Sequence, residues 1–444
     1  MREHIVSRIR EAGVVGAGGA GFPTHVKVFA AAETVIVNGA ECEPLLRVDQ
    51  QLMETQADRL VAGLQAAMAA TGAGQGVIAL KAKYKGAITA LKKAINGSTI
   101  RLHLLADFYP AGDEHVLVYE TVGRVVPQGG IPLKAGCIVL NAETVINIAA
   151  ALEGEAVTHT YLTIAGEVPQ PMTLKLPVGT PVSDALKLAG CCDTTRVAVV
   201  EGGPMMGKLL KDLTQPITKT TKGLIVLEQE HSLVIKKTMT IDRVIKQAKT
   251  ACMQCRYCTD LCPRSLLGHK LEPHKIMRAV KHLESLEEVF KMAFTCSECG
   301  LCEQYACNMR LSPRMVNAML KQEFVKNGLK PDLQLKDQTV SQLWDYRKVP
   351  VKRLIARLDI TKYDKAAPLV EQDYAIKEVR IKLKQHVGPP SQPIVCTGQR
   401  VNRGELVAEI PGNSLGANLH ASIDGIVTDI NDSIVIKAER SCRE

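Results

Sequence analysis

Eight of the fourteen cysteines stand in two tight groups whose spacing is suited to iron–sulfur chemistry. The first group reads CMQCRYCTDLCP and has the spacing C-x2-C-x2-C-x3-C-P. The second reads CSECGLCEQYAC, with a longer gap before its last cysteine. Three thiolates at two-residue gaps can bind one [4Fe–4S] cluster from a single loop. The two groups therefore predict two clusters, whose ligands are the eight cysteines Cys252, Cys255, Cys258, Cys262, Cys296, Cys299, Cys302 and Cys307.

The fourth ligand of each cluster is expected to come from the other cysteine group. In two-cluster ferredoxins the last cysteine of one group binds the cluster of the other group. One predicted ligand set is therefore Cys252, Cys255, Cys258 and Cys307, and the other is Cys296, Cys299, Cys302 and Cys262. Structural zinc is the alternative, since it also uses C-x2-C pairs. The third cysteine of each group disfavours zinc, because a tetrahedral knuckle has no place for it.

A glycine-rich stretch near the start of the chain is suited to binding a phosphate. It reads GAGGAGFPTHVK and covers residues 16–27. Bare backbone N–H groups that lead into a helix N-terminus can cradle an anion. A flexible N-terminal loop is the alternative interpretation of the same glycines.

Polar residues also follow several predicted strands. The apolar run Val35–Val37 in TVIVNGAECEP is expected to be a buried strand, and CIVLNAETVINIAAAL is expected to be a strand that opens into a helix. Strands that end in polar turns before helices indicate an α/β domain with a crevice at the strand C-termini. The polar residues at these turns and in DFYPAGDEHVL are Asn38, Glu41, Tyr109, Asp113, Glu114, Asn141 and Thr144.

Four of these stretches together resemble a known flavin fold. GAGGAGFPTHVK, NGAECEP, YPAGDE and NAET occur in this order in the FMN- and NADH-binding flavoprotein subunit of complex I and in the related RnfC protein of the Rnf complex. The resemblance implies that the glycine loop binds the FMN phosphate, where complex I has an arginine in place of Ala17. It assigns the phosphate to Gly16, Gly18, Gly19 and Lys27, and the rest of the flavin site to Asn38, Glu41, Tyr109, Asp113, Glu114, Asn141 and Thr144.

The elements that position these residues predict a multidomain α/β and α+β protein. Residues 1–153 are expected to form the FMN- and NADH-binding α/β domain, and residues 154–232 resemble the β-grasp module called SLBB. Residues 240–330 are expected to form a helical, ferredoxin-type domain for the two clusters, with a helix over His274–Phe294 and another that has Ser312 as its N-cap and ends at Gly328.

The C-terminal part is expected to be a linker followed by a small barrel. Residues 331–375 are polar and predict a partly helical linker, whereas residues 376–440 have short strands between Gly, Pro and Asn turns. The latter segment resembles the lipoyl-like barrel-sandwich hybrid domain of RnfC, including QHVGPP and HASIDG. It has no lysine in NLHASIDGIV, where lipoyl domains carry theirs, so we expect a docking or structural module.

Composition excludes several classes of function. The chain has 444 residues, of which only 4% are aromatic, and its net charge of +9 is spread along its length. We therefore expect no nucleic-acid partner. There is no apolar run long enough to span a membrane, and the start MREHIVSRIREAG lacks the apolar core of a signal peptide. The expected location is the cytoplasm, where cysteines stay reduced.

The order of the modules narrows the family. The barrel comes last here but first in RnfC, and this order, with YACNMRLSPR at the second cluster motif, resembles the PduS-type corrin (cobalamin) reductases of propanediol utilisation. The resemblance implies an oxidoreductase that uses NADH, FMN and two [4Fe–4S] clusters to reduce cobalamin for a B12-dependent diol dehydratase. It also implies location in a bacterial microcompartment, with an adenosyltransferase or a shell protein as partner.

Two other functions are considered. The first is an RnfC-like electron-transfer protein that delivers electrons to or from a ferredoxin or a membrane partner; the order of the modules disfavours it. The second is a non-catalytic structural or interaction protein with a relic flavin fold. The presence of Lys27, Asn38 and Glu41 disfavours this second alternative. No residue is expected to act as a general acid or base, because the flavin itself carries out the hydride chemistry.

Overall fold

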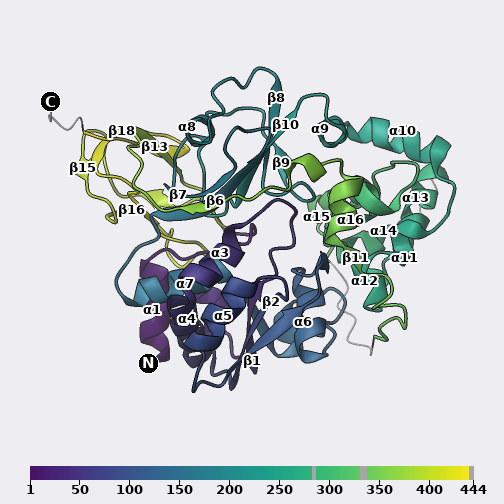
Figure 1. The fold of residues 1–444 in the computed structure, drawn as a ribbon, viewed down its shortest axis with the longest axis horizontal. Helices are drawn as coiled ribbons and strands as arrows, with labels where there is room; N and C mark the ends of the chain where they lie inside the picture. The colour runs from purple at the N-terminus through teal and green to yellow at the C-terminus, as the bar shows by residue number, and fades with distance from the viewer. Residues whose placement is uncertain (283–286, 331–337, 440–444) are drawn as a thin grey trace.

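The structure of the protein is a computed structural model that describes residues 1–282, 287–330 and 338–439. Its parts follow the order of the chain (Figure 1). The N-terminal α/β domain lies at the bottom of the view and a mixed sheet lies above it. The helical domain that carries the cysteine groups is on the right, and the small C-terminal barrel is on the left.

A four-stranded parallel sheet forms the centre of the N-terminal domain, in the order β3-β2-β1-β5. The strands are β1 (Thr34–Gly39), β2 (Gln75–Lys81), β3 (Ile100–Leu105) and β5 (Cys137–Asn141). The inner strands β1 and β2 are apolar and buried along most of their length, as parallel strands covered on both faces must be. The expected strand over Val35–Val37 is confirmed, and Asn38 lies at its C-terminal end.

Helices cover both faces of this sheet. One face packs against most of them: α1 (Arg2–Glu11), α2 (Thr24–Phe29), α3 (Val48–Thr55), α4 (Ala57–Thr71), α5 (Lys85–Ala94) and α7 (Ala142–Leu152). A bare backbone at Gly63 lets α4 approach α7, since an added β-carbon there would lie 1.9 Å from the Val145 carbonyl oxygen. The other face packs against α6 (Glu114–Val122), and residues of the helical domain complete its cover.

The second domain is built on a six-stranded sheet in the order β12-β7-β6-β10-β8-β9. Its strands are β6 (His159–Gly166), β7 (Met172–Pro177), β8 (Val197–Glu201), β9 (Lys208–Leu209), β10 (Gly223–Glu228) and β12 (Leu369–Val370). One helix, α8 (Val182–Leu188), packs on its apolar core. The edge strand β12 comes from far along the chain and pairs in parallel with β7.

The cysteine groups lie in a helical domain. Its helices are α9 (Ser232–Lys237), α10 (Ile241–Ala251), α11 (Tyr257–Asp260), α12 (Pro263–Leu266), α13 (Pro273–His282), α14 (Glu287–Lys291) and α15 (Pro313–Lys326). The helix expected over His274–Phe294 corresponds to α13, α14 and a 3-10 turn over Met292–Thr295, with residues 283–286 outside the described part of the chain. Ser312 is the N-cap of α15 as expected, although its side chain makes no capping bond.

Residues 338–375 of the expected linker lie against the two domains that precede the helices. Strand β11 (Val349–Pro350) pairs with β4 (Phe108–Tyr109) and leads into α16 (Val351–Arg357). Trp344 is buried on α6, where its ring stacks edge-on against Tyr119 and its Nε1 donates to Glu120 Oε1 over 2.7 Å. Residues 331–337 of the expected linker lie outside the described residues.

The C-terminal barrel has two small antiparallel sheets. One has the order β13-β19-β18-β15 and the other β14-β16-β17. The strands are β13 (Glu378–Lys382), β14 (Gln392–Pro393), β15 (Arg400–Val401), β16 (Leu406–Glu409), β17 (Leu419–His420), β18 (Gly425–Ile430) and β19 (Ser433–Lys437). Across all four parts, each helix in the described ranges falls short of the length and hydrophobicity that crossing a bilayer requires.

Candidate flavin site and iron–sulfur centres

The glycine loop forms a closed turn over the start of α7. Gly16 N–H donates to the Phe22 carbonyl over 2.9 Å, and Ala17 N–H donates to Thr144 Oγ1 over 2.9 Å. A β-carbon added to Gly18 would lie 3.6 Å from Asn141 Cβ. At Gly19, where φ is +106°, an added β-carbon would meet no atom within 4 Å. The predicted residues Gly16, Gly18, Gly19, Asn141 and Thr144 are therefore brought together, with bare backbone facing open space.

Two contacts bring the YPAGDE segment to the same edge of the sheet. Asn38 Nδ2 donates to the Gly112 carbonyl over 2.9 Å. Lys27 Nζ, on α2, lies 3.1 Å from Glu114 Oε1 at the start of α6, and both side chains are partly exposed. A partly exposed ammonium on the helix that follows the glycine loop is suited to a phosphate, because it can exchange its carboxylate partner for the phosphate.

A buried group of carboxylates lies next to these residues. Glu41 accepts hydrogen bonds from the N–H groups of Asp49 and Gln50, over 2.8 and 3.2 Å. Burial and the neighbouring Asp49 raise the pKa of Glu41 to about 7. Asn141 Nδ2 donates to Asp49 Oδ2 over 2.8 Å, while Asp49 Oδ1 is buried without a partner. A free buried acceptor of this kind fits an N–H or hydroxyl group of a flavin.

Sequence reasoning missed Asp49, and it missed a buried ion pair beside it. Lys222 contacts Glu143, and burial lowers the pKa of Lys222 to about 8. The one available signal for Asp49 was its place eight residues after Glu41, at the start of the next helix. Lys222 gave no such signal, since it comes from the second domain. Taken together, the bare glycines, the ammonium of Lys27 and the free carboxylate oxygen of Asp49 fit FMN.

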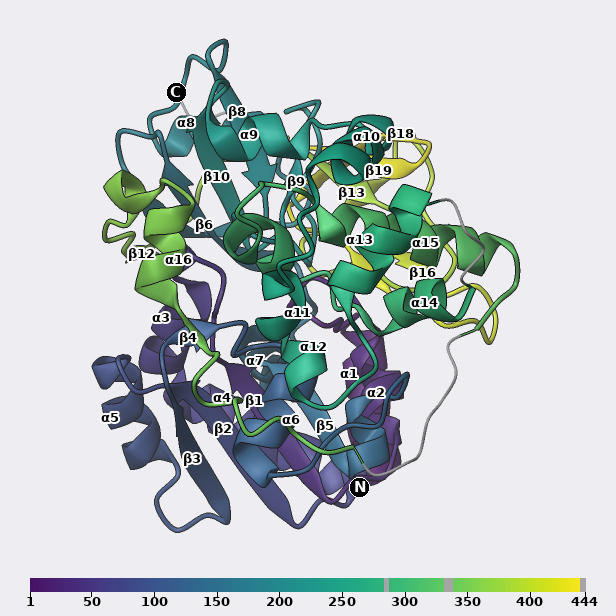
Figure 2. The same cartoon turned by 90° about the vertical axis from the view of Figure 1, so that its right-hand side faces the viewer.

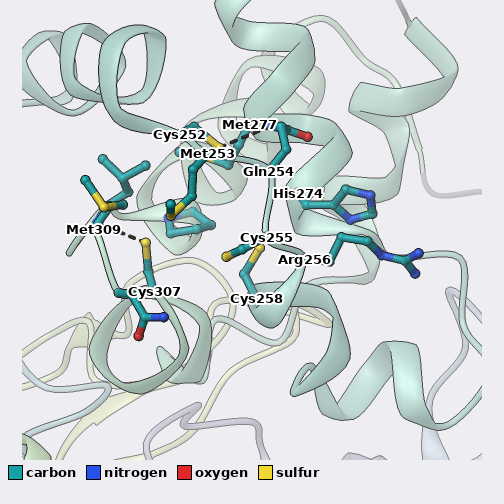
Figure 3. Close-up of a pocket in the computed structure, with 13 residues that line it drawn as sticks. Cys252, Met253, Gln254, Cys255, Arg256, Cys258, His274, Met277, Cys307 and Met309 are labelled. Carbon is teal, nitrogen blue, oxygen red and sulfur yellow. Dashed lines mark hydrogen bonds between the residues drawn. The ribbon is translucent and has the colours of Figure 1, made fainter.

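One cysteine cavity, which we call the outer cavity, lies near the surface of the helical domain (Figure 3). The cysteines that line it are Cys252, Cys255, Cys258 and Cys307. Gln254 Nε2 donates to Cys252 Sγ over 3.1 Å, and the N–H of Leu311 donates to Cys307 Sγ over 3.3 Å. These donors stabilise thiolates and cluster sulfur. Met253 and Met309 also line the cavity, and each side chain remains about half exposed or more, at 65% and 45%.

The second cavity, which we call the inner cavity, is lined by the cysteines Cys262, Cys296, Cys299 and Cys302. The two cavities thus group the eight cysteines in the crossed pattern predicted from their spacing. Arg264 and Asn317 line the inner cavity, and both are at least nine-tenths buried. Arg264 Nε and Nη1 and Asn317 Nδ2 have no hydrogen-bond partner in the structure. Unpaired buried donors beside four thiols fit the sulfur atoms of a [4Fe–4S] cluster.

The cavities suit four-iron clusters better than single ions. Among the residues that the structure describes, no three His, Cys, Asp or Glu side chains converge closely enough to hold one metal ion. In each cavity four cysteine side chains line one shared space, as the ligands of a [4Fe–4S] cluster do. Burial raises the pKa of Cys258 and Cys262 to about 12. These thiols would therefore ionise only on binding iron, which deprotonates its thiol ligands.

The inner cavity adjoins the flavin domain directly. Tyr109 is buried and its hydroxyl donates to the Cys299 carbonyl over 2.5 Å. Arg264, on α12, lies with Nη2 2.9 Å from Asp113 Oδ2, and Asp113 also caps α6 by accepting from the N–H groups of His115 and Val116. Figure 2 shows α12 reaching from the helical domain toward the N-terminal sheet. Tyr109 and Asp113 therefore connect the flavin domain to the inner cavity.

Glu43 makes a further connection between domains. Its two carboxylate oxygens accept from the N–H groups of Met205 and Met206, over 2.9 and 2.8 Å, in a turn of the second domain. Met205 in turn lies beside Gly300 in the second cysteine group, where an added β-carbon would be 3.4 Å from the Met205 carbonyl oxygen. Three domains therefore meet at the inner cavity.

Comparison with known proteins identifies each part. Residues 9–150 match the Nuo51 FMN-binding domain, and residues 161–209 match the SLBB domain. Residues 251–312 match a 4Fe-4S dicluster domain, and residues 359–442 match the RnfC barrel sandwich hybrid domain. These matches confirm the predicted fold class, with a flavin-binding domain and a domain for two clusters.

Comparison with individual relatives shows the family to which the chain belongs. The chain is 46% identical to the cobalamin reductase PduS of Salmonella typhimurium, over 98% of this chain and 96% of the relative. It is also 46% identical to the cobalamin reductase PduS of Citrobacter freundii, over 97% and 95%. A component of the Na⁺-translocating ferredoxin:NAD⁺ oxidoreductase complex of Acetobacterium woodii is 35% identical, over 58% of this chain and 57% of that component. The chain belongs to the PduS cobalamin reductase family.

Proposed function

We propose that the protein is an NADH-dependent cob(III)alamin/cob(II)alamin reductase, which takes electrons from NADH and delivers them singly to the cobalt of cobalamin. When bound, FMN accepts a hydride and releases single electrons, and [4Fe–4S] clusters carry single electrons. Family membership supports cobalamin as the acceptor. Two cavities of four cysteines each support one-electron transfer.

One observation supports the proposed direction of electron transfer: different parts of the protein surround the two cavities. Tyr109 and Asp113 connect the inner cavity to the flavin domain. The residues that line the outer cavity all lie between Cys252 and Pro313, so no side chain of the flavin domain is among them. The exposed side chains of Met253 and Met309 line it instead. We therefore place the entry of electrons at the inner cavity and the acceptor at the outer one.

The chain's own residues would bind and orient the groups rather than transfer protons. Lys27 and the glycine loop would hold the FMN phosphate, and Asn38, Glu41, Glu114, Asn141 and Thr144 would surround the rest of the flavin. Tyr109 and Asp113 would fix the flavin domain against the inner cavity. Arg264 and Asn317 would donate hydrogen bonds to sulfur there and so influence the potential.

Protein partners and location extend the same proposal. An adenosyltransferase or a microcompartment shell protein would accept the product or hold the enzyme, and the enzyme would reside within a bacterial microcompartment. Membership of the PduS family is what supports both statements.

The test uses the full chain after anaerobic reconstitution with iron, sulfide and FMN. NADH and hydroxocobalamin are added, and cobalt reduction is followed by absorbance. Cys255→Ala, at the exposed side of the outer cavity, should lower cobalamin reduction by about tenfold or more. It should leave NADH oxidation by ferricyanide unchanged. Cys396→Ala, which removes an exposed cysteine of the barrel, is the matched control.

The outcomes separate the alternatives. If Cys255→Ala reduces cobalamin as fast as the parent protein, the acceptor meets the flavin and not the outer cavity. If the parent protein reduces a ferredoxin but not cobalamin, the RnfC-like alternative is correct. If it reduces neither while holding both clusters, the chain is a non-catalytic interaction protein.

A further inference from the structure

A buried lysine lies where the flavin domain, the second domain and the C-terminal barrel meet. Lys219 belongs to the loop between β9 and β10, and only 4% of its surface is exposed. Its Nζ donates to the Gly13 carbonyl over 2.7 Å and to the Asn418 carbonyl over 2.9 Å. Gly13 precedes the glycine loop, and Asn418 precedes β17 of the barrel. One ammonium therefore ties the barrel to the backbone that leads into the flavin site.

The barrel also contacts the glycine loop itself. The N–H of Val387 donates to the Gly21 carbonyl over 3.0 Å. Gly21 closes the loop, because its own N–H donates to the Gly16 carbonyl over 3.2 Å. The side chain of Gln385, next to this contact, accepts from the N–H of Lys219 over 3.0 Å. The same barrel segment thus holds Gly21 and the lysine.

Both contacts leave no room for a side chain on the flavin domain. A β-carbon added to Gly13, where φ is +67°, would lie 2.2 Å from the Asn418 carbonyl oxygen. One added to Gly21, where φ is +64°, would lie 2.9 Å from the Gln385 carbonyl oxygen. At Gly19, between them, an added β-carbon would meet nothing. The barrel therefore contacts the backbone at Gly13, before the loop, and at Gly21, near the end of the loop. The space around Gly19, between these two contacts, is free.

We propose that the C-terminal barrel is a clamp that holds the glycine loop in its FMN-binding shape, with Lys219 and Gln385 as positioning residues. A loop rich in glycine loses much conformational freedom when it is ordered, and this loss weakens binding unless the loop is already ordered. Contacts from outside the loop supply that order before FMN arrives. The inference rests on FMN binding by the N-terminal domain and gives the barrel a role. Figure 1 shows the barrel beside the second domain, above α1.

The test measures FMN affinity rather than turnover. Flavin-free protein is titrated with FMN, whose fluorescence is quenched on binding, and the release rate is measured after dilution. Lys219→Met should raise the Kd about tenfold and speed FMN release, because the loop loses its outside support. Iron and sulfide content should stay at the parent level. Lys237→Met is the matched control, since Lys237 Nζ donates to the Gly207 carbonyl over 2.6 Å, in a contact without the barrel.

A second pair of variants decides the question if Lys219→Met does not fold. Gln385→Ala removes the acceptor that the barrel offers to Lys219, and it should also raise the Kd for FMN. Gln399→Ala is its control, because Gln399 Oε1 accepts from the N–H of Cys396 within the barrel. If the Lys219 or Gln385 variant folds with parent-level FMN affinity, the clamp is refuted. An equal loss in the control variants refutes it as well. A parent protein that binds no FMN would instead overturn the proposed function.

Discussion

The proposed contact between Lys27 and the FMN phosphate can be tested with a predicted magnitude. In the structure Lys27 Nζ pairs with Glu114 Oε1 at 3.1 Å, with side-chain exposures of 28% and 44%. A hydrogen bond between a charged donor and a phosphate contributes about 1.5–3 kcal/mol. Displacing a partly exposed ion pair costs about 0.2–1 kcal/mol. The net contribution is therefore about 0.5–2.8 kcal/mol, which corresponds to a rise in Kd of about 2- to 100-fold in Lys27→Ala.

The assay is a fluorescence titration of flavin-free protein with FMN at two salt concentrations. The Kd difference between parent and Lys27→Ala should shrink at higher salt, because a partly exposed charge contact is screened. Lys83→Ala is the control, since Lys83 makes a 2.8 Å ion pair with Asp107 in the same domain and is also partly exposed. Glu114→Gln should leave the phosphate contact intact and remove its competitor. Parent-level FMN affinity in Lys27→Ala would remove Lys27 from the phosphate site.

Three further outcomes follow from the site and the packing. The reconstituted chain should hold about eight irons. In the EPR spectrum, Cys262→Ala should remove the signal of the cluster in the inner cavity and leave the signal of the cluster in the outer cavity. Loss of the outer-cavity signal instead would contradict the crossed ligation. Met253→Glu at the outer cavity should raise the KM for cobalamin without changing the iron content. Ile235→Glu, at a similarly exposed apolar residue, should leave this KM unchanged. Equal effects of the two variants on the KM would show that cobalamin does not bind at the outer cavity. Burial lowers the pKa of His420 from 6.5 to about 3. Between these two pH values His420 binds a proton in the unfolded state but not in the folded state. The free energy of unfolding therefore falls as the pH falls, by up to about 1.4 kcal/mol per pH unit. His420→Gln should flatten the loss of thermal stability below pH 6.5, and an unchanged pH profile would show that this histidine does not cause it.

The sequence by itself determined the types of chemistry and the order of the modules. Cysteines two residues apart come from one loop, so their spacing alone predicts a cluster motif. The glycine loop and the turns after β1 and β5 are also local features, and the α/β domain predicted around them is present, built on a parallel sheet. Matches to four domain families in the expected order confirm the architecture. The individual flavin residues and cluster ligands remain predictions for the experiments above.

Only the tertiary structure decided which domain faces which cavity. Tyr109 and Cys299 are 190 residues apart, and Asp113 and Arg264 are 151 apart, yet both pairs are in hydrogen-bond contact. Local patterns carry no information about such contacts, since each residue taken alone is also typical of a solvated turn. For the same reason the sequence did not reveal that Asp49 Oδ1 is a buried acceptor without a partner, because the burial of a side chain depends on the residues that pack over it.

The position of the barrel shows this difference most clearly. Its short strands were predictable from the Gly, Pro and Asn turns between them, but its contact with the glycine loop was not. Lys219 is 206 residues from Gly13 and 199 residues from Asn418, and it contacts both. A lysine in a polar sequence is ordinarily a surface residue, so its sequence context indicated exposure. Its burial arises because the flavin domain, the second domain and the barrel enclose it together, and that enclosure exists only in the folded chain.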